Sequence, residues 1–337
     1  MTHLCIKKSS KFLGLASGLS LFVISFASSI ALGQTPIALE TVVDSFINFD
    51  ETSVEHIIVT TSRISRAIIA TVIGASLAIA GALMQALTRN PLASPSIFGI
   101  NAGAVFFVVL AISFFSISSL TDYMWVAFLG AGVAAIMVYF LGSLGRDGLS
   151  PIKIVLAGAA ITALFVSLTQ ALLVISQQNL EGVLFWLAGS VAGRTMDMLE
   201  PILPYMIVGW IIAFFLGHPV NILTSGEDIA KGLGQRTILV KVLMAMVIVL
   251  LAGGSVAVGG SIGFIGLIIP HIVRGLVGND YRWIIPYCAL FGASLLLLAD
   301  VAARFIIMPQ EVPIGVMTAL IGTPFFIYIA RRGFNKE

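Results

Sequence analysis

The stretch Gly259–Pro286, which reads GGSIGFIGLIIPHIVRGLVGNDYRWIIP, decides how the chain is built. It follows one long apolar run and contains a second, shorter run just before Pro270. The 13 residues from Ser261 to Val273 would form a helix of about 20 Å. A bilayer has a hydrocarbon core about 30 Å thick, so this helix is too short to cross it alone. The pattern predicts a broken span that begins inside the protein, with its approach Gly253–Gly260 shielded by neighbouring helices.

The glycines of this stretch have two interpretations. Broken, glycine-interrupted helices line the path through many transporters. Small residues also let membrane helices pack closely, without any further role. Taken one at a time, the glycines leave both interpretations open.

Composition places the chain in a membrane. It is 58% hydrophobic and 10% charged over 337 residues, whereas soluble domains average about 25% charged residues. Apolar runs of about 18 residues or more, separated by short polar breaks, predict an all-α polytopic membrane protein rather than a barrel. Cys5 and Cys288 lie far apart and give no disulfide or metal framework.

Ten apolar segments predict about ten transmembrane helices in a single domain that covers residues 1–337. The first segment follows Lys7, Lys8 and Lys11, as the core of a signal peptide would. It is long enough to span a membrane, so we expect it to be a retained helix. The ten predicted spans are 12–33, 64–87, 97–117, 122–144, 152–175, 198–216, 237–258, 261–276, 284–304 and 314–330.

Basic residues predict the orientation. Ten spans put both termini on one side, and with that side inside, 14 of the 18 Lys and Arg residues are inner ones. This excess follows the positive-inside rule and predicts cytoplasmic N- and C-termini. The outer four are Arg63, Arg66, Arg194 and Arg304; the inner ones are Lys7, Lys8, Lys11, Arg89, Arg146, Lys153, Lys231, Arg236, Lys241, Arg274, Arg282, Arg331, Arg332 and Lys336.

The outer arginines need an explanation of their own. Arg63 and Arg66 are three residues apart and therefore share a helical face at the outer rim. They could be snorkelling anchors. Arg304 lies one turn after Asp300, and an ionisable pair inside a span is costly unless it is partnered. Local pairing of Asp300 with Arg304 is therefore one interpretation, and a functional site is the other.

The inner loop at about 218–236 predicts a short helix of about two turns. Thr224-x-x-Glu227 matches a capping box, and Gly234 is a plausible C-terminal stop. Ile229 and Leu233, four residues apart, give the helix one apolar stripe. A helix that lies on the membrane surface would carry more Lys and Arg, so the pattern favours a knob that docks on a soluble partner.

Several polar residues gather near the predicted inner ends of spans. Gln85 closes the second span, which is rich in Gly, Ala and Ser and is therefore predicted to be buried. Asn90 and Leu92 lie in the proline-bounded turn that follows, and Ser150 precedes the fifth span. Pro270, His271 and Arg274 belong to the broken span, and we expect a structural role for His271 rather than a ligand role. Between the fifth and sixth spans, Phe185–Ser190 predicts a short outer or re-entrant helix, although an interfacial aromatic belt explains Trp186 equally well.

Signatures of enzymes are missing from the sequence. There is no G-x-x-x-x-G-K-[ST] loop for nucleotide phosphates. No set of residues has metal-ligand spacing or suggests nucleophilic catalysis. We therefore expect no catalytic residue, no metal and no cofactor in this chain, and any uphill transport needs an energy source outside it.

Four segments, Gly74–Pro95, Gly259–Arg282, Leu298–Arg304 and Glu311–Phe325, together resemble the permease family of ABC importers for ferric siderophores, haem and cobalamin. The resemblance runs from about Arg63 to Arg331 and rests on RNPLA-x-P, GFIGL-x-x-PH-x-x-R and E-x-P-x-G-x-x-TA-x-x-G-x-P-F. It implies ten spans in a bacterial cytoplasmic membrane, a second permease subunit that is identical or a paralogue, two separate ATPases that bind the ATP, and an extracytoplasmic substrate-binding protein. Membrane lipid is the remaining expected partner, and no nucleic acid is expected.

The resemblance also implies roles for individual residues. Arg63, Arg66 and Arg304 match outer arginines that pair with glutamates of the binding protein. The helix with Glu227, Asp228, Ile229, Leu233 and Gly234 matches the coupling helix that sits on the ATPase. Asn90 and Leu92, with Gln85 beside them, match the inner end of the path. Ser150 matches a second gate loop, in which Pro151 and Ile152 replace the small hydroxyl residues of the cobalamin permease.

The sequence therefore predicts a permease subunit that moves a ferric siderophore. A haem or cobalamin importer of the same family is the alternative within the family. An ion-coupled secondary carrier would need intramembrane acids, and the sequence has almost none apart from Asp300. A membrane-embedded enzyme would need a catalytic set that the sequence does not show.

Overall fold

The computed structural model describes residues 8–115, 119–144, 150–175 and 188–334. These residues form helices and connecting loops, without a strand among them. Among these described residues, seven helices are long and apolar enough to cross a membrane, and Ile100–Phe115, Ile265–Val277 and Ile314–Ile327 are shorter apolar helices. The prediction of an all-α polytopic membrane protein is confirmed.

The elements follow one another in an order close to that of the predicted spans. They are α1 (Lys8–Ala31), α2 (Leu39–Ile47), α3 (Val54–Ile57), η1 (Ile58–Arg63), α4 (Ile64–Thr88), η2 (Pro95–Phe98), α5 (Ile100–Phe115), α6 (Leu120–Ser143), α7 (Pro151–Ile175), α9 (Met196–Leu199), α10 (Leu203–Thr224), α11 (Glu227–Gly232), α12 (Thr237–Ile248), η4 (Val249–Gly253), α13 (Gly254–Gly259), α14 (Ile265–Val277), α15 (Tyr281–Phe305) and α16 (Ile314–Phe334).

Helix α4 is the centre of the bundle, and every residue from Ile73 to Thr88 is buried. It packs against α14 and α15 at distances that only glycine allows. A Cβ atom on Gly81 would lie 1.9 Å from the carbonyl oxygen of Gly266, and one on Gly74 would lie 2.4 Å from that of Gly292. The prediction that the second span is buried by other helices is confirmed.

The broken span that the sequence predicted is present. Helix α12, η4 and α13 form one crossing over Thr237–Gly259, and all residues from 251 to 260 are buried. The chain then leaves the helix at Gly260 and enters α14 after Phe264, which has a φ of +67°. Helix α14 has 13 residues, so it is too short to cross a bilayer by itself.

Two predicted spans differ from the observed helices. The sixth span, predicted at 198–216, is α10 at Leu203–Thr224, which continues through Pro219. Proline usually ends a helix, but here Asn221 holds the last turn by donating to Asp280 over 2.6 Å and accepting from the backbone N–H of Tyr281 over 2.8 Å. The third span was predicted to begin at 97, but a 3-10 turn and the positive φ of Gly99 delay its start.

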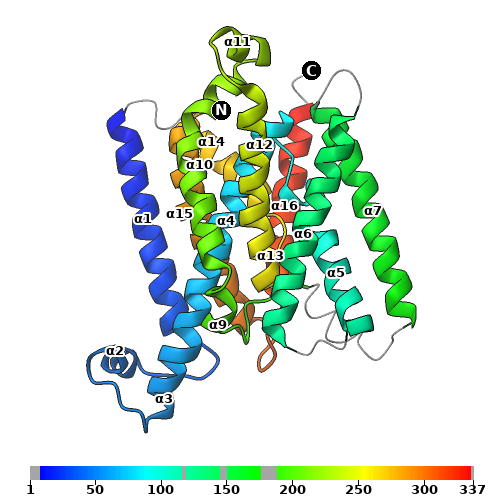
Figure 1. Cartoon of the computed structure of the whole chain (residues 1–337). Helices are drawn as coiled ribbons and strands as arrows, with labels where there is room; N and C mark the ends of the chain where they lie inside the picture. The colour runs from blue at the N-terminus through cyan, green and yellow to red at the C-terminus, as the bar shows by residue number, and fades with distance from the viewer. Residues whose placement is uncertain (1–7, 116–118, 145–149, 176–187, 335–337) are drawn as a thin grey trace.

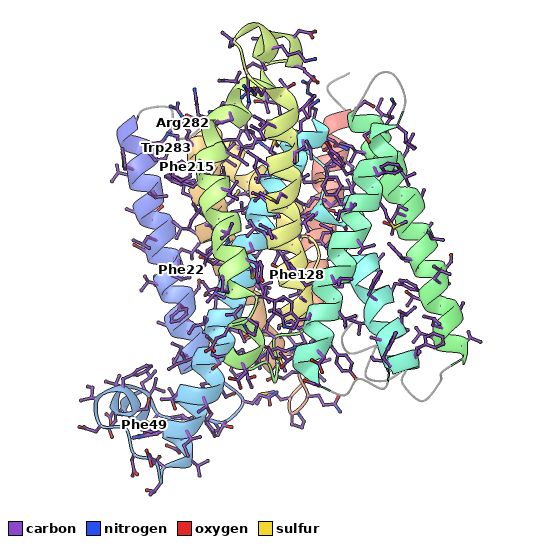
Figure 2. The ribbon with its side chains drawn as sticks, viewed as in Figure 1. Phe22, Phe49, Phe128, Phe215, Arg282 and Trp283 are labelled. Atoms are coloured by element: carbon purple, nitrogen blue, oxygen red, sulfur yellow. The ribbon has the colours of Figure 1, made fainter. Side chains whose placement is uncertain are left out.

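The two ends of the bundle differ in character (Figure 1). Helix α11 projects from one end, where α1 begins and α16 ends, whereas α2 and α3 lie at the opposite end. We refer to these as the α11 end and the α2 end. Arg282 and Trp283 lie at the α11 end and Phe49 lies at the α2 end (Figure 2). Which end faces the cytoplasm stays a prediction.

Candidate functional site

A polar hollow lies where α5, α7 and the loop before α14 meet. Two cavities of about 220 and 430 Å³ share Ser96 and Asn101 in their walls. Nδ2 of Asn101 donates a hydrogen bond to Oγ of Ser261 over 3.0 Å, which ties α5 to the loop. The other polar residues among the lining residues that the structure describes are Ser94, Thr162, Thr169 and Gln170. The hollow therefore offers hydroxyl and amide groups in walls that are otherwise apolar.

The loop Gly260–Phe264 forms one edge of this hollow. A Cβ atom on Gly263 would meet no atom within 4 Å, so the hollow is open beside it. Phe264 is wedged against α16, because a Cβ atom on Gly322 would lie only 2.4 Å from its ring. The loop is therefore positioned by α14 on one side and α16 on the other.

Gln85 and Arg274 meet near the α11 end of the bundle. Nη1 of Arg274 donates a hydrogen bond to Oε1 of Gln85, and Nη2 donates to the hydroxyl of Tyr281 over 3.1 Å. Nε2 of Gln85 lies 3.4 Å from the carbonyl oxygens of Gly266 and Leu267. The sequence predicted separate roles for Gln85 and Arg274, and the structure joins them into one contact between α4, α14 and α15.

The other residues predicted near the α11 end do not join several helices as Gln85 and Arg274 do. Asn90 is exposed and its side-chain oxygen accepts from the backbone N–H of Leu92 over 2.9 Å, which forms a tight turn. Ser150 accepts from the backbone N–H of Lys153 over 3.4 Å at the start of α7. His271 is half-buried with its ring edge-on to Phe325 at 6.0 Å, and Pro270 is buried within α14. Most of the predicted second gate loop, 145–149, lies outside the described residues, as do Phe185 and Trp186.

Helix α11 presents its apolar stripe to solvent. The exposed fractions are 56% for Ile229 and 69% for Leu233, and Asp228 is exposed beside them. Gly234 has a φ of +79° and its N–H donates to the carbonyl of Lys231, so the predicted stop is confirmed. The stripe therefore stands at the α11 end, and within the residues described here no other element covers it.

The predicted capping box of α11 is wrong. Thr224 is the last residue of α10 and its hydroxyl donates to the carbonyl of Asn221, while Gly226, with a φ of +137°, makes the turn into α11. Glu227 instead accepts from Nζ of Lys241 over 2.8 Å, and this hydrogen bond lowers the pKa of the Glu227 carboxyl. The side chain that was expected to cap the helix thus ties it to α12.

The arginines at the α2 end are not the exposed rim charges that the sequence predicted. Arg63 is 4% exposed and Arg304 is 2% exposed. Arg63 donates to the carbonyls of Ile30, Ala31 and Thr35 at 2.6–2.9 Å. Arg304 donates to the carbonyls of Ser29 and Leu32 at 2.8 and 2.6 Å. A helix leaves its last four carbonyls without partners, and these two guanidinium groups satisfy three of them at the end of α1, those of Ser29, Ile30 and Ala31.

Asp300 is the centre of this cluster and is fully buried. Arg66 pairs with it at 2.7 Å and with Glu311 at 2.8 Å, and Arg304 pairs with it from one turn away. Local pairing of Asp300 with Arg304 is therefore observed, and Arg66 completes it. The side chain of Arg66 is 13% exposed, so it is the most exposed of the three arginines. A docking role for these arginines stays a prediction.

Known proteins match this chain over nearly its whole length. Residues 21–332 match the FecCD transport family. The probable siderophore transport system permease protein YfiZ of Bacillus subtilis is 54% identical over 330 residues, which cover 98% of this chain and 99% of that protein. The Fe(3+)-citrate import system permease protein YfmD of the same organism is 41% identical over 98% of each chain. A solved inward-facing metal-chelate type ABC transporter has a TM-score of 0.83 at 30% identity and covers 94% of this chain.

Proposed function

The chain belongs to the FecCD transport family and is a permease subunit of an ABC importer, and we propose that its cargo is a ferric siderophore. The observation that carries the choice of cargo is the 54% identity to a siderophore permease over 98% of the chain. The alternative cargoes within the family are haem and cobalamin.

The polar hollow at Asn101 and Ser261 is the part of the path that meets the cargo. Its described lining offers hydroxyl and amide groups, together with apolar side chains. Such groups hydrogen-bond a chelate from outside without competing for its iron, because Fe(III) in the chelate already has its ligands. Soft or charged metal ligands are absent from the residues named in these walls. This chemistry suits passage of an intact chelate rather than of a bare ion.

Helix α11 is the contact with a separate ATPase subunit, and the α11 end faces the cytoplasm. The exposed Ile229 and Leu233 provide an apolar surface of the kind that seats in a partner. Helix α11 leads directly into α12 and is tied to it by Glu227 and Lys241. A push on α11 would therefore be transmitted to the span that carries η4 and the loop at the hollow.

The remaining partners follow from the same proposal. A second permease subunit completes the path, and an extracytoplasmic binding protein delivers the chelate at the α2 end. The same proposal includes a bacterial cytoplasmic membrane as the location of the chain. The whole of 1–337 acts as one permease domain.

An ion-coupled carrier receives no support from Asp300. The carboxylate of Asp300 is held by two guanidinium groups, those of Arg66 and Arg304. A carboxylate held in this way is poorly suited to exchange a proton or cation during each transport cycle.

The proposal is tested by transport into proteoliposomes that contain the permease with its ATPase and binding protein. Radiolabelled ferric hydroxamate, ferric catecholate, ferric citrate, haem and cobalamin serve as separate substrates. We expect one of the ferric siderophores to accumulate only when ATP is hydrolysed. Accumulation of haem or cobalamin in preference to every ferric chelate would overturn the cargo, and uptake driven by an ion gradient without ATPase would overturn the mechanism.

A further inference from the structure

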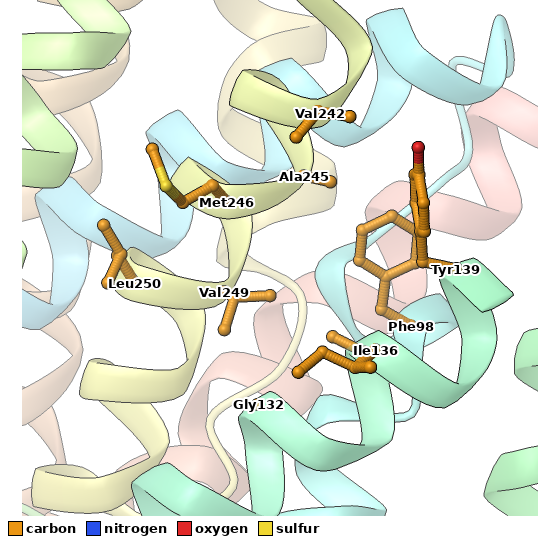
Figure 3. A pocket seen from close by; sticks show the side chains of 10 residues that line it. Phe98, Gly132, Ile136, Tyr139, Val242, Ala245, Met246, Val249 and Leu250 are labelled. Carbon is orange, nitrogen blue, oxygen red and sulfur yellow. The ribbon is translucent and has the colours of Figure 1, made fainter. Parts of the chain in front are cut away.

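An apolar crevice of about 310 Å³ opens between α6 and the segment formed by α12 and η4 (Figure 3). Ile136 and Tyr139 line it from α6, Val242 and Met246 line it from α12, and Phe98 closes it. Helix α6 packs against η4 and α13 but hardly touches α12, so the two helices diverge. The crevice lies in the space left by this divergence.

No side chain of the described residues fills the space beside Gly132, which lines the crevice from α6. A Cβ atom on Gly132 of α6 would have no neighbouring atom within 4 Å. Apolar surface that faces an empty space loses the dispersion contacts that stabilise a close-packed interior. A molecule that entered this space from the membrane would restore those contacts.

Water does not fit the chemistry of the crevice. An ordered water needs two to four polar partners, and apolar cavities stay dry. The hydroxyl of Tyr139 is the polar side-chain group among the residues that line this wall. The occupant must therefore be apolar.

A second copy of the chain is also a poor fit. Large lining residues from both walls are exposed, with exposed fractions of 69% for Ile136, 38% for Val242 and 40% for Met246. Membrane helices pack on one another through small residues, and such residues are exposed elsewhere, at Ala159, Ala160 and Ala163 of α7. The bulky rim of the crevice instead continues the lipid-facing surfaces of α6 and α12.

We propose that the crevice is a binding site for one acyl chain of a membrane phospholipid. This acyl chain lies between α6 and α12 and fills the space beside Gly132. The segment that it supports includes η4, a π-helical turn over Val249–Gly253, and such turns are frequent at functional sites. A fluid acyl chain keeps this side of α12 in contact with apolar atoms while leaving it free to shift against α6. This inference does not depend on which chelate is transported.

The site is tested with the full chain, purified and reconstituted with a phosphatidylethanolamine that carries a diazirine in its acyl chain. We expect crosslinks to concentrate on the crevice walls of α6 and α12 and to saturate at a low lipid-to-protein ratio. Native mass spectrometry should show one retained phospholipid per chain. Gly132→Phe fills the crevice and should lower crosslinking there by about tenfold, whereas Leu129→Phe, on the exposed face of α6 outside the wall, should not.

Two results would overturn the site. Crosslinks spread evenly over α1 and α6 and unaffected by Gly132→Phe would mean ordinary annular lipid only. Loss of a dimer in Gly132→Phe, with crosslinking unchanged, would assign the crevice to a second copy. If Gly132→Phe does not accumulate, Ala245→Met fills the opposite wall and is judged by the same two measurements.

Discussion

Arg274 of α14 donates a hydrogen bond to Gln85 of α4, one turn of α4 beyond the close contact between Gly81 and the backbone of Gly266. The same arginine reaches the hydroxyl of Tyr281 at the start of α15. Gln85 is 3% exposed, so its amide has little access to water. This contact fixes the position of the short helix α14 relative to the central helix of the bundle.

Replacing Gln85 by Leu should destabilise the protein, because Arg274 then loses a partner in a buried setting. Hydrogen bonds to charged groups contribute about 1.5–3 kcal/mol. Arg274→Met should have a similar effect. The double variant should lose less free energy of unfolding than the two single variants lose together. Thermal unfolding in detergent measures this, with Thr71→Ala as a control, since that hydroxyl bonds its own helix. Strictly additive losses would show that the two side chains are not coupled.

Changing Ile229 and Leu233 to Asp should uncouple the permease from its ATPase. Burying one such side chain contributes about 1.5–3 kcal/mol, and about 1.4 kcal/mol is tenfold in affinity. We therefore expect co-purification of the ATPase and chelate uptake to fall together, while membrane insertion persists. Thr224→Ala is a matched change in the same exposed region. Normal uptake in the double Asp variant would show that the stripe is not the ATPase contact.

The sequence predicted features of the fold that depend on local pattern. The broken span at Gly259–Pro286 follows from counting apolar residues against bilayer thickness. The buried position of α4 follows from its content of small residues, and its contacts at Gly74 and Gly81 are the reason those residues are small. The apolar stripe of α11 follows from spacing alone, and it is exposed as predicted.

Features that depend on contacts between distant segments could not be predicted in this way. Arg304 and Ser29 are 275 positions apart, yet their hydrogen bond explains why an arginine is buried at the α2 end. Asn101 and Ser261 stand out as polar residues in small-residue segments, but only the fold brings them together. Helix α10 continues beyond the predicted end at 216, and the contacts of Asn221 with the start of α15 that hold its last turn are also distant in sequence.

Orientation is tested by single cysteines at the two ends, in a background from which Cys5 and Cys288 have been removed. Lys231 lies on α11 and Glu51 lies in the loop between α2 and α3, and both residues are exposed. The excess of basic residues predicts that Lys231→Cys reacts with an impermeant reagent only after the cells are opened. Glu51→Cys should react in intact cells. The reverse pattern of labelling would place the α2 end in the cytoplasm.

Charge reversal at Arg304 distinguishes a structural role in the buried cluster from a role in docking the binding protein. In the structure its guanidinium pairs with buried Asp300 and satisfies carbonyls at the end of α1. Arg304→Glu would place two acids one turn apart, next to a helix end that is already negative. Breaking a buried ion pair costs about 3–5 kcal/mol, which is a large part of the roughly 5–15 kcal/mol that stabilises a typical protein. We therefore expect little folded protein in the membrane, even when no binding protein is present.

The docking role makes a different prediction for the same position. If Arg304 mainly met a carboxylate of the binding protein, Arg304→Glu would insert normally and bind its ATPase, and a reciprocal Glu→Arg change on the binding protein would restore uptake. Arg304→Lys serves as the control, because it keeps the charge but cannot reach several carbonyls at once. Arg66→Lys is the matched change at the most exposed of the three arginines, where loss of binding-protein affinity without loss of stability would support docking. A stable, correctly inserted Arg304→Glu protein would show that the contact with α1 is not needed for folding.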